Sequence, residues 1–181
     1  MGTGRSSFID PFPGTFVAID FETADNGADS ACAIGMVRLE HGRVTRRVRQ
    51  FFRPPRDIMM FTHIHGISMD FLLDKPDFAQ AWPLLREVIE GADFLAAHNA
   101  GFDRGVMHAC LDRAGMDYPS QPWVCTVRQA RNTLGVFPAH LANVCRVMNI
   151  RLNHHEALSD AEACARIVLA ATSARKQIPA S

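Results

Sequence analysis

The chain has 181 residues, of which 48% are hydrophobic and 21% charged, as expected for one globular domain. Its formal net charge is zero, which excludes recruitment of nucleic acid by a global electrostatic field, so such a partner must be met at a local site. No apolar run approaches the roughly 18 residues that span a bilayer, and the five cysteines form no C-x-x-C pair. We therefore expect free thiols, no membrane contact and a cytoplasmic location.

The first half of the chain predicts three strands in a meander. Residues 1–13 are rich in Gly, Ser and Pro and are expected to form a flexible leader. Thr15 to Ile19 is a continuous apolar run, which is typical of a strand buried on both faces. Further strands are predicted from Ala31 to Leu39 and from Val44 to Phe52, with the His41-Gly42 turn between them.

The second half predicts strands that alternate with helices. Short strands are expected from Phe94 to Ala97 and from Trp123 to Cys125. Apolar residues at spacings of three or four predict the helices, at residues 78–89, 102–114, 127–134, 139–148 and 157–171. These elements predict an α/β fold with a mixed five-stranded sheet, an antiparallel meander followed by parallel strands, flanked by helices. One domain would span residues 14–175, with a short tail at 176–181.

The first stretch that carries chemistry is Ile19-Asp20-Phe21-Glu22-Thr23. Alternation along a strand places Asp20 and Glu22 on one face. Two neighbouring carboxylates repel each other and are costly to desolvate unless cations neutralise them. The alternative is a strand that runs into solvent with two acids at its edge.

A second polar stretch follows the strand at Phe94 to Ala97. His98 and Asn99 lie at the end of that strand, and Asp103 lies in the first turn of the next predicted helix. As an alternative to a catalytic role, Asp103 would cap the helix and interact with its positive end. Capping alone leaves His98 and Asn99 at the same strand end unexplained.

The third stretch is Asn153-His154-His155-Glu156-Ala157-Leu158-Ser159-Asp160, at the entrance of the last helix. Here the imidazole of His155, before the helix, and the carboxylate of Asp160, on the helix, are able to contact the same ligand from two sides. The alternative is that His154 and His155 are exposed loop residues without a function.

Taken together, the three stretches supply four carboxylates and an imidazole. Oxygen ligands of this kind suit two hard divalent cations, Mg²⁺ or Mn²⁺. Two such ions about 3.5–4 Å apart activate a water and stabilise the leaving oxygen in phosphodiester hydrolysis. A neutral imidazole is suited to take the proton of the attacking water.

The motifs "IDFET", "AHNAGFD" and "HHEALSDA" resemble the three exonuclease motifs of the DnaQ-like 3′–5′ exonucleases of the DEDD superfamily, which include the DNA polymerase III epsilon subunit and RNase T. The resemblance extends from about Phe16 to Ala171, with the motifs in the family's order. It implies a ribonuclease-H-like fold. It also implies the histidine (DEDDh) branch, because the histidine stands five residues before the last aspartate. The implied metal ligands are Asp20, Glu22, Asp103 and Asp160, and the implied general base is His155. His154 lacks that spacing and is expected to be replaceable.

The resemblance also points to substrate contacts. Phe61-Thr62-His63-Ile64-His65-Gly66-Ile67 is similar to the family's T-x-x-H-G-I loop beside the terminal nucleotide, although its two histidines leave a zinc site as an alternative. Gly66 would permit a close approach of the backbone to a ligand. Phe21 and Phe102 are expected either to stack on bases or to pack in the core. The expected substrate-binding residues are Phe21, Thr23, His65, His98, Asn99 and Phe102.

A run of arginines without an intervening acid has two interpretations. It would track a phosphate backbone, or it would keep the edge of a sheet charged and solvated. Its members are Arg43, Arg46, Arg47, Arg49, Arg53 and Arg56.

The function expected from these observations is that of a metal-dependent 3′–5′ exonuclease. It would release nucleoside 5′-monophosphates from single-stranded 3′ ends of DNA, in proofreading or repair, with a polymerase or repair complex as a partner. One alternative is an exoribonuclease that trims RNA 3′ ends or degrades short oligoribonucleotides. An alternative of another class is a partner-binding replicase subunit with vestigial activity.

Overall fold

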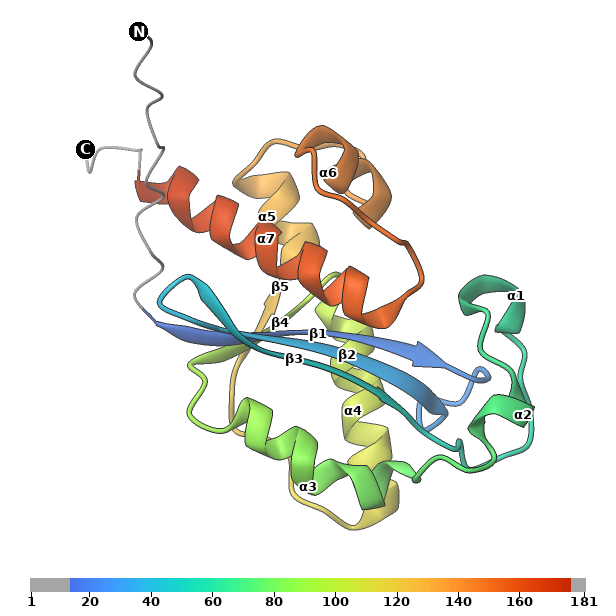
Figure 1. The fold of residues 1–181 in the computed structure, drawn as a ribbon. Coiled ribbons are helices and arrows are strands. Elements are labelled where there is room, and N and C mark those ends of the chain that lie inside the picture. Colours follow the sequence, from blue (N-terminus) through green and yellow to red (C-terminus); the bar gives the residue numbers. More distant parts are fainter. Residues whose placement is uncertain (1–13, 177–181) are drawn as a thin grey trace, which may run out of the picture.

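The computed structural model describes residues 14–176, so the predicted leader at 1–13 and the tail from residue 177 onward lie outside the described residues. Five strands form one sheet in the order β3-β2-β1-β4-β5 (Figure 1). The strands β1, β2 and β3 are antiparallel, whereas β4 and β5 continue the sheet in parallel with β1. This arrangement confirms the predicted mixed sheet. The strands are β1 (Thr15–Thr23), β2 (Ala31–Glu40), β3 (Arg43–Phe51), β4 (Phe94–Ala97) and β5 (Trp123–Cys125).

Helices cover both faces of the sheet. In Figure 1, α7 crosses one face with α5 and α6 behind it, and α3 and α4 lie against the other face. The helices are α1 (Thr62–His65), α2 (Met69–Leu72), α3 (Phe78–Ile89), α4 (Ala100–Ala114), α5 (Thr126–Asn132), α6 (Leu141–Val147) and α7 (Ala157–Lys176). None of the helices within residues 14–176 is long and apolar enough to cross a membrane.

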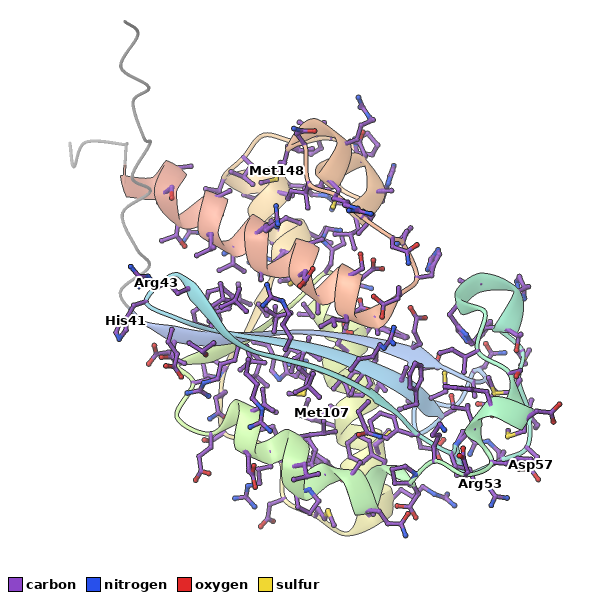
Figure 2. The ribbon with its side chains drawn as sticks, in the orientation of Figure 1. His41, Arg43, Arg53, Asp57, Met107 and Met148 are labelled. Atoms are coloured by element: carbon purple, nitrogen blue, oxygen red, sulfur yellow. The ribbon has the colours of Figure 1, made fainter. Side chains whose placement is uncertain are left out.

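The apolar run of β1 is continuous because both faces of the strand are covered. Val17 and Ile19 belong to the core between the sheet and helices α3 and α4, which we call the lower core. Phe16 and Ala18 pack in the core under α7, the upper core. Met107 of α4 is fully buried in the lower core (Figure 2). Alternation along β1 therefore divides its side chains between two hydrophobic layers.

Several predicted bounds coincide with the structure and others differ. The helix α3 begins at Phe78, as predicted, because Asp77 and Gln80 form a capping box. Pro83 lies inside α3, beyond its first turn. The helix α4 begins two residues earlier than predicted, directly after Asn99, whose φ of 79° is left-handed. The helix α7 extends to Lys176, which the prediction had assigned to the tail.

The helices α1 and α2 were not predicted. Each has only four residues, which is too short for an apolar repeat to show in the sequence. Gly66 ends α1 with a φ of 74°, and no atom lies within 4 Å of where its Cβ would stand. The need for a left-handed residue accounts for this glycine, and a close approach of its backbone to a ligand stays a prediction.

Candidate active site

Three carboxylates meet at the end of β1. Asp20 and Glu22 alternate with the lower-core residues of that strand, so they face the side of the sheet that α7 covers. Asp160, in the first turn of α7, lies over them. Ligand oxygens of these three side chains all lie within 4.8 Å of one another. The predicted association of the strand motif with the last helix is thus present in space.

The position of α7 over β1 depends on a glycine that the sequence analysis did not single out. Gly35 of β2 is the cross-strand partner of Asp20. A Cβ at Gly35 would stand 2.1 Å from the carbonyl oxygen of Ala157 and 2.4 Å from the amide nitrogen of Leu158. Only glycine lets the first turn of α7 seat this closely on the sheet, and that turn carries Asp160.

Asp103 enters the site from the other side of the sheet. It is buried in the first turn of α4, and its Oδ1 accepts a hydrogen bond from the backbone N–H of Phe21 at 3.1 Å. It is not among the three carboxylates whose ligand atoms lie within 4.8 Å of one another. Its negative charge nevertheless contributes to raising the pKa values of Asp20 and Glu22, so it belongs to the same electrostatic cluster.

The cluster holds more negative charge than the surrounding residues balance. Burial, followed by repulsion from Asp103 and Asp160, raises the pKa of Asp20 well above its usual range. Burial and the neighbouring carboxylates raise the pKa of Glu22 to about 8, and burial raises that of Asp103 to about 7. The Oδ1 atom of Asp160 is buried and has no hydrogen-bond partner in the described part of the chain. Unpartnered, crowded carboxylate oxygens of this kind fit a divalent cation.

The two histidines before α7 hold different positions relative to Asp160. Nδ1 of His154 lies 2.8 Å from Asp160 Oδ2, and the backbone N–H of His155 donates to the same oxygen at 3.2 Å. The two rings stack with centroids 3.8 Å apart. His154 therefore contacts the carboxylate cluster directly, a contact that the sequence analysis did not predict. His155 has a φ of 67°, and this left-handed backbone turns the chain into α7.

His155 is suited to remain neutral. Burial, followed by the charge of His154, lowers the pKa of the His155 imidazole. Its side chain is exposed and lines the cleft, and its ring nitrogens form no hydrogen bond to another residue within residues 14–176. A neutral, accessible imidazole beside a carboxylate cluster is able to accept a proton.

A cleft of about 610 Å³ opens over the carboxylates. Thr23, Asn99 and Phe102 line it, and the Phe102 side chain is 48% exposed, so it is free to contact a ligand. Phe21 is only 4% exposed and packs in the lower core. Alternation along β1 turns the Phe21 ring away from the α7 side, which favours the core alternative, but Phe21 also lines the cleft, so its contact with substrate stays a prediction. Its contribution to the site is the backbone N–H that holds Asp103.

His98 and His65 use both ring nitrogens within the protein. Nε2 of His98 donates to the carbonyl oxygen of Ala139 at 2.9 Å, and Nδ1 pairs with the Thr126 hydroxyl at 2.9 Å. Nδ1 of His65 accepts from the N–H of Ile67 at 3.0 Å, and Nε2 lies 3.2 Å from the carbonyl oxygen of Thr23. Burial lowers the pKa of both rings. These hydrogen bonds hold loops around the cleft, and contact of His65 and His98 with substrate stays a prediction.

The zinc alternative has no support in the geometry. Among the described residues, neither His63 nor His65 belongs to a group of potential metal ligands. Because both nitrogens of His65 are already hydrogen-bonded, its ring has no lone pair directed at a free site.

The arginine run follows β3, the edge strand, and the loop after it. Arg47 pairs with Glu162 at 2.6 Å and Arg49 with Glu156 at 3.2 Å, both acids lying on or just before α7. In the same way Arg46 pairs with Glu87, Arg53 with Asp57, and Arg56 with Asp25 and Asp29. Figure 2 shows Arg43 beside the β2–β3 turn, and Arg53 and Asp57 beyond the other end of β3. Pairing along the strand favours the charged sheet edge over a phosphate-binding track.

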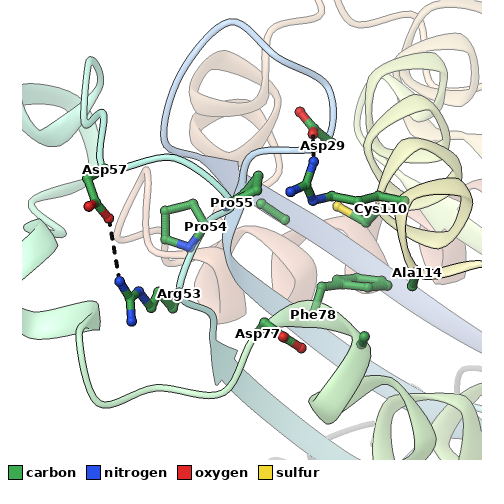
Figure 3. Close-up of a pocket in the computed structure, with 12 residues that line it drawn as sticks. Asp29, Arg53, Pro54, Pro55, Asp57, Asp77, Phe78, Cys110 and Ala114 are labelled. Atoms are coloured by element: carbon green, nitrogen blue, oxygen red, sulfur yellow. Dashed lines mark hydrogen bonds and ion pairs between the residues drawn. The ribbon is translucent and has the colours of Figure 1, made fainter.

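A second cavity, of about 480 Å³, lies away from the carboxylates (Figure 3). Pro54, Pro55 and Phe78 form its apolar walls. Its arginines are paired, Arg53 with Asp57 at 3.8 Å and Arg113 with Asp29 at 3.4 Å. None of the predicted site residues lines this cavity.

Comparisons with known proteins agree with the geometry. A family model described as Exonuclease, of the RNase T type, matches residues 17–168. The DNA polymerase III PolC-type of Oceanobacillus iheyensis is 32% identical over 154 residues, which are 82% of this chain and only 11% of that relative. Exonuclease X, solved in complex with 5′ overhanging duplex DNA, superposes with a TM-score of 0.72 at 23% identity, covering 90% of this chain and 94% of that one. The nuclease domain of 3′hExo, a DEDDh family member bound to rAMP, gives a TM-score of 0.71 at 15% identity, covering 93% and 95%. Both solved structures share the fold of this chain.

Proposed function

This chain belongs to the DEDDh family of 3′–5′ exonucleases, and from that premise we propose that it hydrolyses single-stranded DNA from the 3′ end with two divalent metal ions, Mg²⁺ or Mn²⁺. The products would be nucleoside 5′-monophosphates. The observation that carries the proposal is the meeting of Asp20, Glu22 and Asp160 within 4.8 Å, with one buried oxygen of Asp160 left without a partner. A structural protein has no need for such crowded, unneutralised carboxylates.

Each proposed ligand has its own support. Asp20, Glu22 and Asp160 would hold the metal ions jointly, and Asp103 would complete the set from α4. Bound divalent ions lower the pKa of water and neutralise charge on the leaving oxygen. The chain itself orients these ligands: the N–H of Phe21 holds Asp103, and the N–H of His155 holds Oδ2 of Asp160.

His155 is the proposed general base. Its lowered pKa leaves the ring unprotonated at neutral pH, so one of its free ring nitrogens accepts the proton of the attacking water. Nδ1 of His154 donates to Oδ2 of Asp160. It is proposed to orient the carboxylate and to take no part in proton transfer.

DNA is preferred over RNA on the basis of the relatives. The Oceanobacillus relative is a DNA polymerase, and Exonuclease X was solved with duplex DNA. RNA is the second candidate, because 3′hExo was solved with rAMP. Because the chain spans about a tenth of the polymerase relative, action alongside a polymerase or repair complex is also part of the proposal. The presence of all five proposed catalytic side chains argues against a vestigial site.

The test is release of mononucleotides from matched DNA and RNA oligonucleotides with Mg²⁺ or Mn²⁺. Wild type is expected to shorten the DNA from its 3′ end, and Asp20→Asn is expected to abolish this. Asp117→Asn, at an exposed acid outside the cleft, is the matched control and should retain full activity. Absence of mononucleotide release by wild type under either metal would refute the enzymatic proposal. Faster release of mononucleotides from RNA than from DNA would identify RNA, the second candidate, as the preferred substrate.

A further inference from the structure

We propose that Arg131 of α5 binds a phosphate of the substrate strand other than the one being cleaved, an inference that rests on the proposed function. Arg131 lines the same cleft as Asp20, Glu22 and Asp160. Among the described residues that line this cleft, it is the one arginine or lysine. A strand that enters a cleft containing several carboxylates carries its own negative charge on every phosphate. The phosphates outside the metal site therefore need a cation supplied by the protein.

Arg131 is available for this contact because no acid in the described chain pairs with it. Within residues 14–176 it forms no ion pair, whereas Arg47 and Arg49 of the edge strand both pair with acids. Its side chain is exposed to solvent. An unpaired guanidinium does not have to leave a protein carboxylate before it binds a phosphate, and its planar fork suits two phosphate oxygens.

The helix explains why Arg131, and not its neighbour, faces the cleft. Val127 and Arg131 are four residues apart on α5, and both line the cleft. Arg128 is exposed on the same helix but lines a different hollow, with Trp123 and Gln129. Arg128 and Arg131 thus have the same charge, are both exposed and lie on the same helix, but only Arg131 faces the cleft.

A second donor, His140, lines the same cleft as Arg131. Nδ1 of His140 accepts the backbone N–H of Asn143 at 3.2 Å, so in the neutral ring the proton resides on Nε2. His140 is exposed and lines the cleft. Its Nε2–H is therefore able to donate to a phosphate oxygen in the cleft. The α5–α6 side supplies donors to a cleft whose β1 and α7 side supplies acids.

The experiment compares Arg131→Ala and Arg131→Lys with Arg128→Ala in the full chain, using a single-stranded DNA of about ten nucleotides. Arg131→Ala is expected to raise KM by roughly 10- to 100-fold with little change in kcat, because a non-scissile phosphate contact supports binding in the ground state and transition state alike. The slope of log KM against log salt should fall by about 0.7. Arg131→Lys should recover part of the affinity, and Arg128→Ala should match wild type.

Binding is measured separately by fluorescence anisotropy with the same labelled DNA, in a background of Asp103→Asn that prevents turnover. Equal affinity with Arg131→Ala and Arg128→Ala would overturn the inference, as would a fall in kcat at constant KM. If Arg131→Ala were unstable to heat, Arg131→Gln would carry the same comparison. If wild type releases no mononucleotide, the proposed function fails, while the anisotropy comparison still decides the role of Arg131.

Discussion

Replacing Gly35 by alanine is expected to disable the site while leaving the fold in place. The new methyl carbon would stand 2.1 Å from the carbonyl oxygen of Ala157, where ordinary contacts begin at 3.4 Å. The obstacle is helix backbone, which cannot rotate away as a side chain does. The first turn of α7 must therefore rise by about 1 Å or more, and Asp160 rises with it.

The consequences of this displacement follow from its size. Overpacking of this kind costs about 1–3 kcal/mol of unfolding free energy, which for a chain of this length lowers the melting temperature by roughly 2–12 °C. The effect on catalysis should be larger in proportion, because a misplacement of about 1 Å in catalytic geometry reduces the rate by about 10²-fold. Affinity for Mn²⁺ should also fall, since Asp160 would be displaced by about 1 Å relative to Asp20 and Glu22, with which it groups as a potential metal ligand.

The assays are kcat/KM on single-stranded DNA, Mn²⁺ titration by calorimetry and thermal melting. Gly105→Ala is the matched control: it introduces the same methyl group in α4 at a position with no atom within 4 Å. Alanine is the better helix former by about 1 kcal/mol, so this control should melt a few degrees higher than wild type. A Gly35→Ala protein with wild-type metal affinity and rate would show that close packing of α7 against β2 is not needed to position Asp160.

Further expectations concern the charges of the site and its surroundings. In the metal-free protein, Glu22 and Asp103 have raised pKa values of about 8 and about 7, so their contribution to stability is present in acid and is lost as pH rises from about 4 to 8. The melting temperature measured in chelator should fall over this range, and added Mg²⁺ should restore it most at the alkaline end; a flat profile would contradict this. His155→Ala should lose about 10²–10⁴ in rate, whereas His154→Ala should stay within about tenfold of wild type in the same assay, and the reverse order would reassign the base. Arg56→Ala should lower the unfolding free energy in urea by about 1–3 kcal/mol, because it leaves the buried Asp25 without its ion-pair partner and Asp29 with Arg113 alone; an unchanged midpoint would count against that bridge.

The secondary structure was predicted best where burial imposes a pattern on the chain. The bounds of α3, β4 and β5 coincide with the prediction, because apolar periodicity and turn residues are local signals. The strand β1 runs from Thr15 to Thr23, so Asp20 and Glu22 lie on it as the predicted alternation requires, although their acidic side chains interrupt its apolar pattern. The short helices α1 and α2 carry no such pattern and were missed.

The acids could be placed at the end of β1, at the start of α4 and at the entrance of α7 from the sequence alone, because strand alternation and helix starts are local properties of the chain. Only the tertiary structure decided what stands opposite each of them. It buried the Phe21 ring and exposed that of Phe102, and it placed His154 on Asp160. It also packed α7 against Gly35 and placed Arg131 in the cleft without an ion-pair partner among residues 14–176. Periodicity predicts which face of a strand or helix a side chain lies on. The residue that it contacts belongs to a segment far along the chain, so that contact depends on tertiary packing.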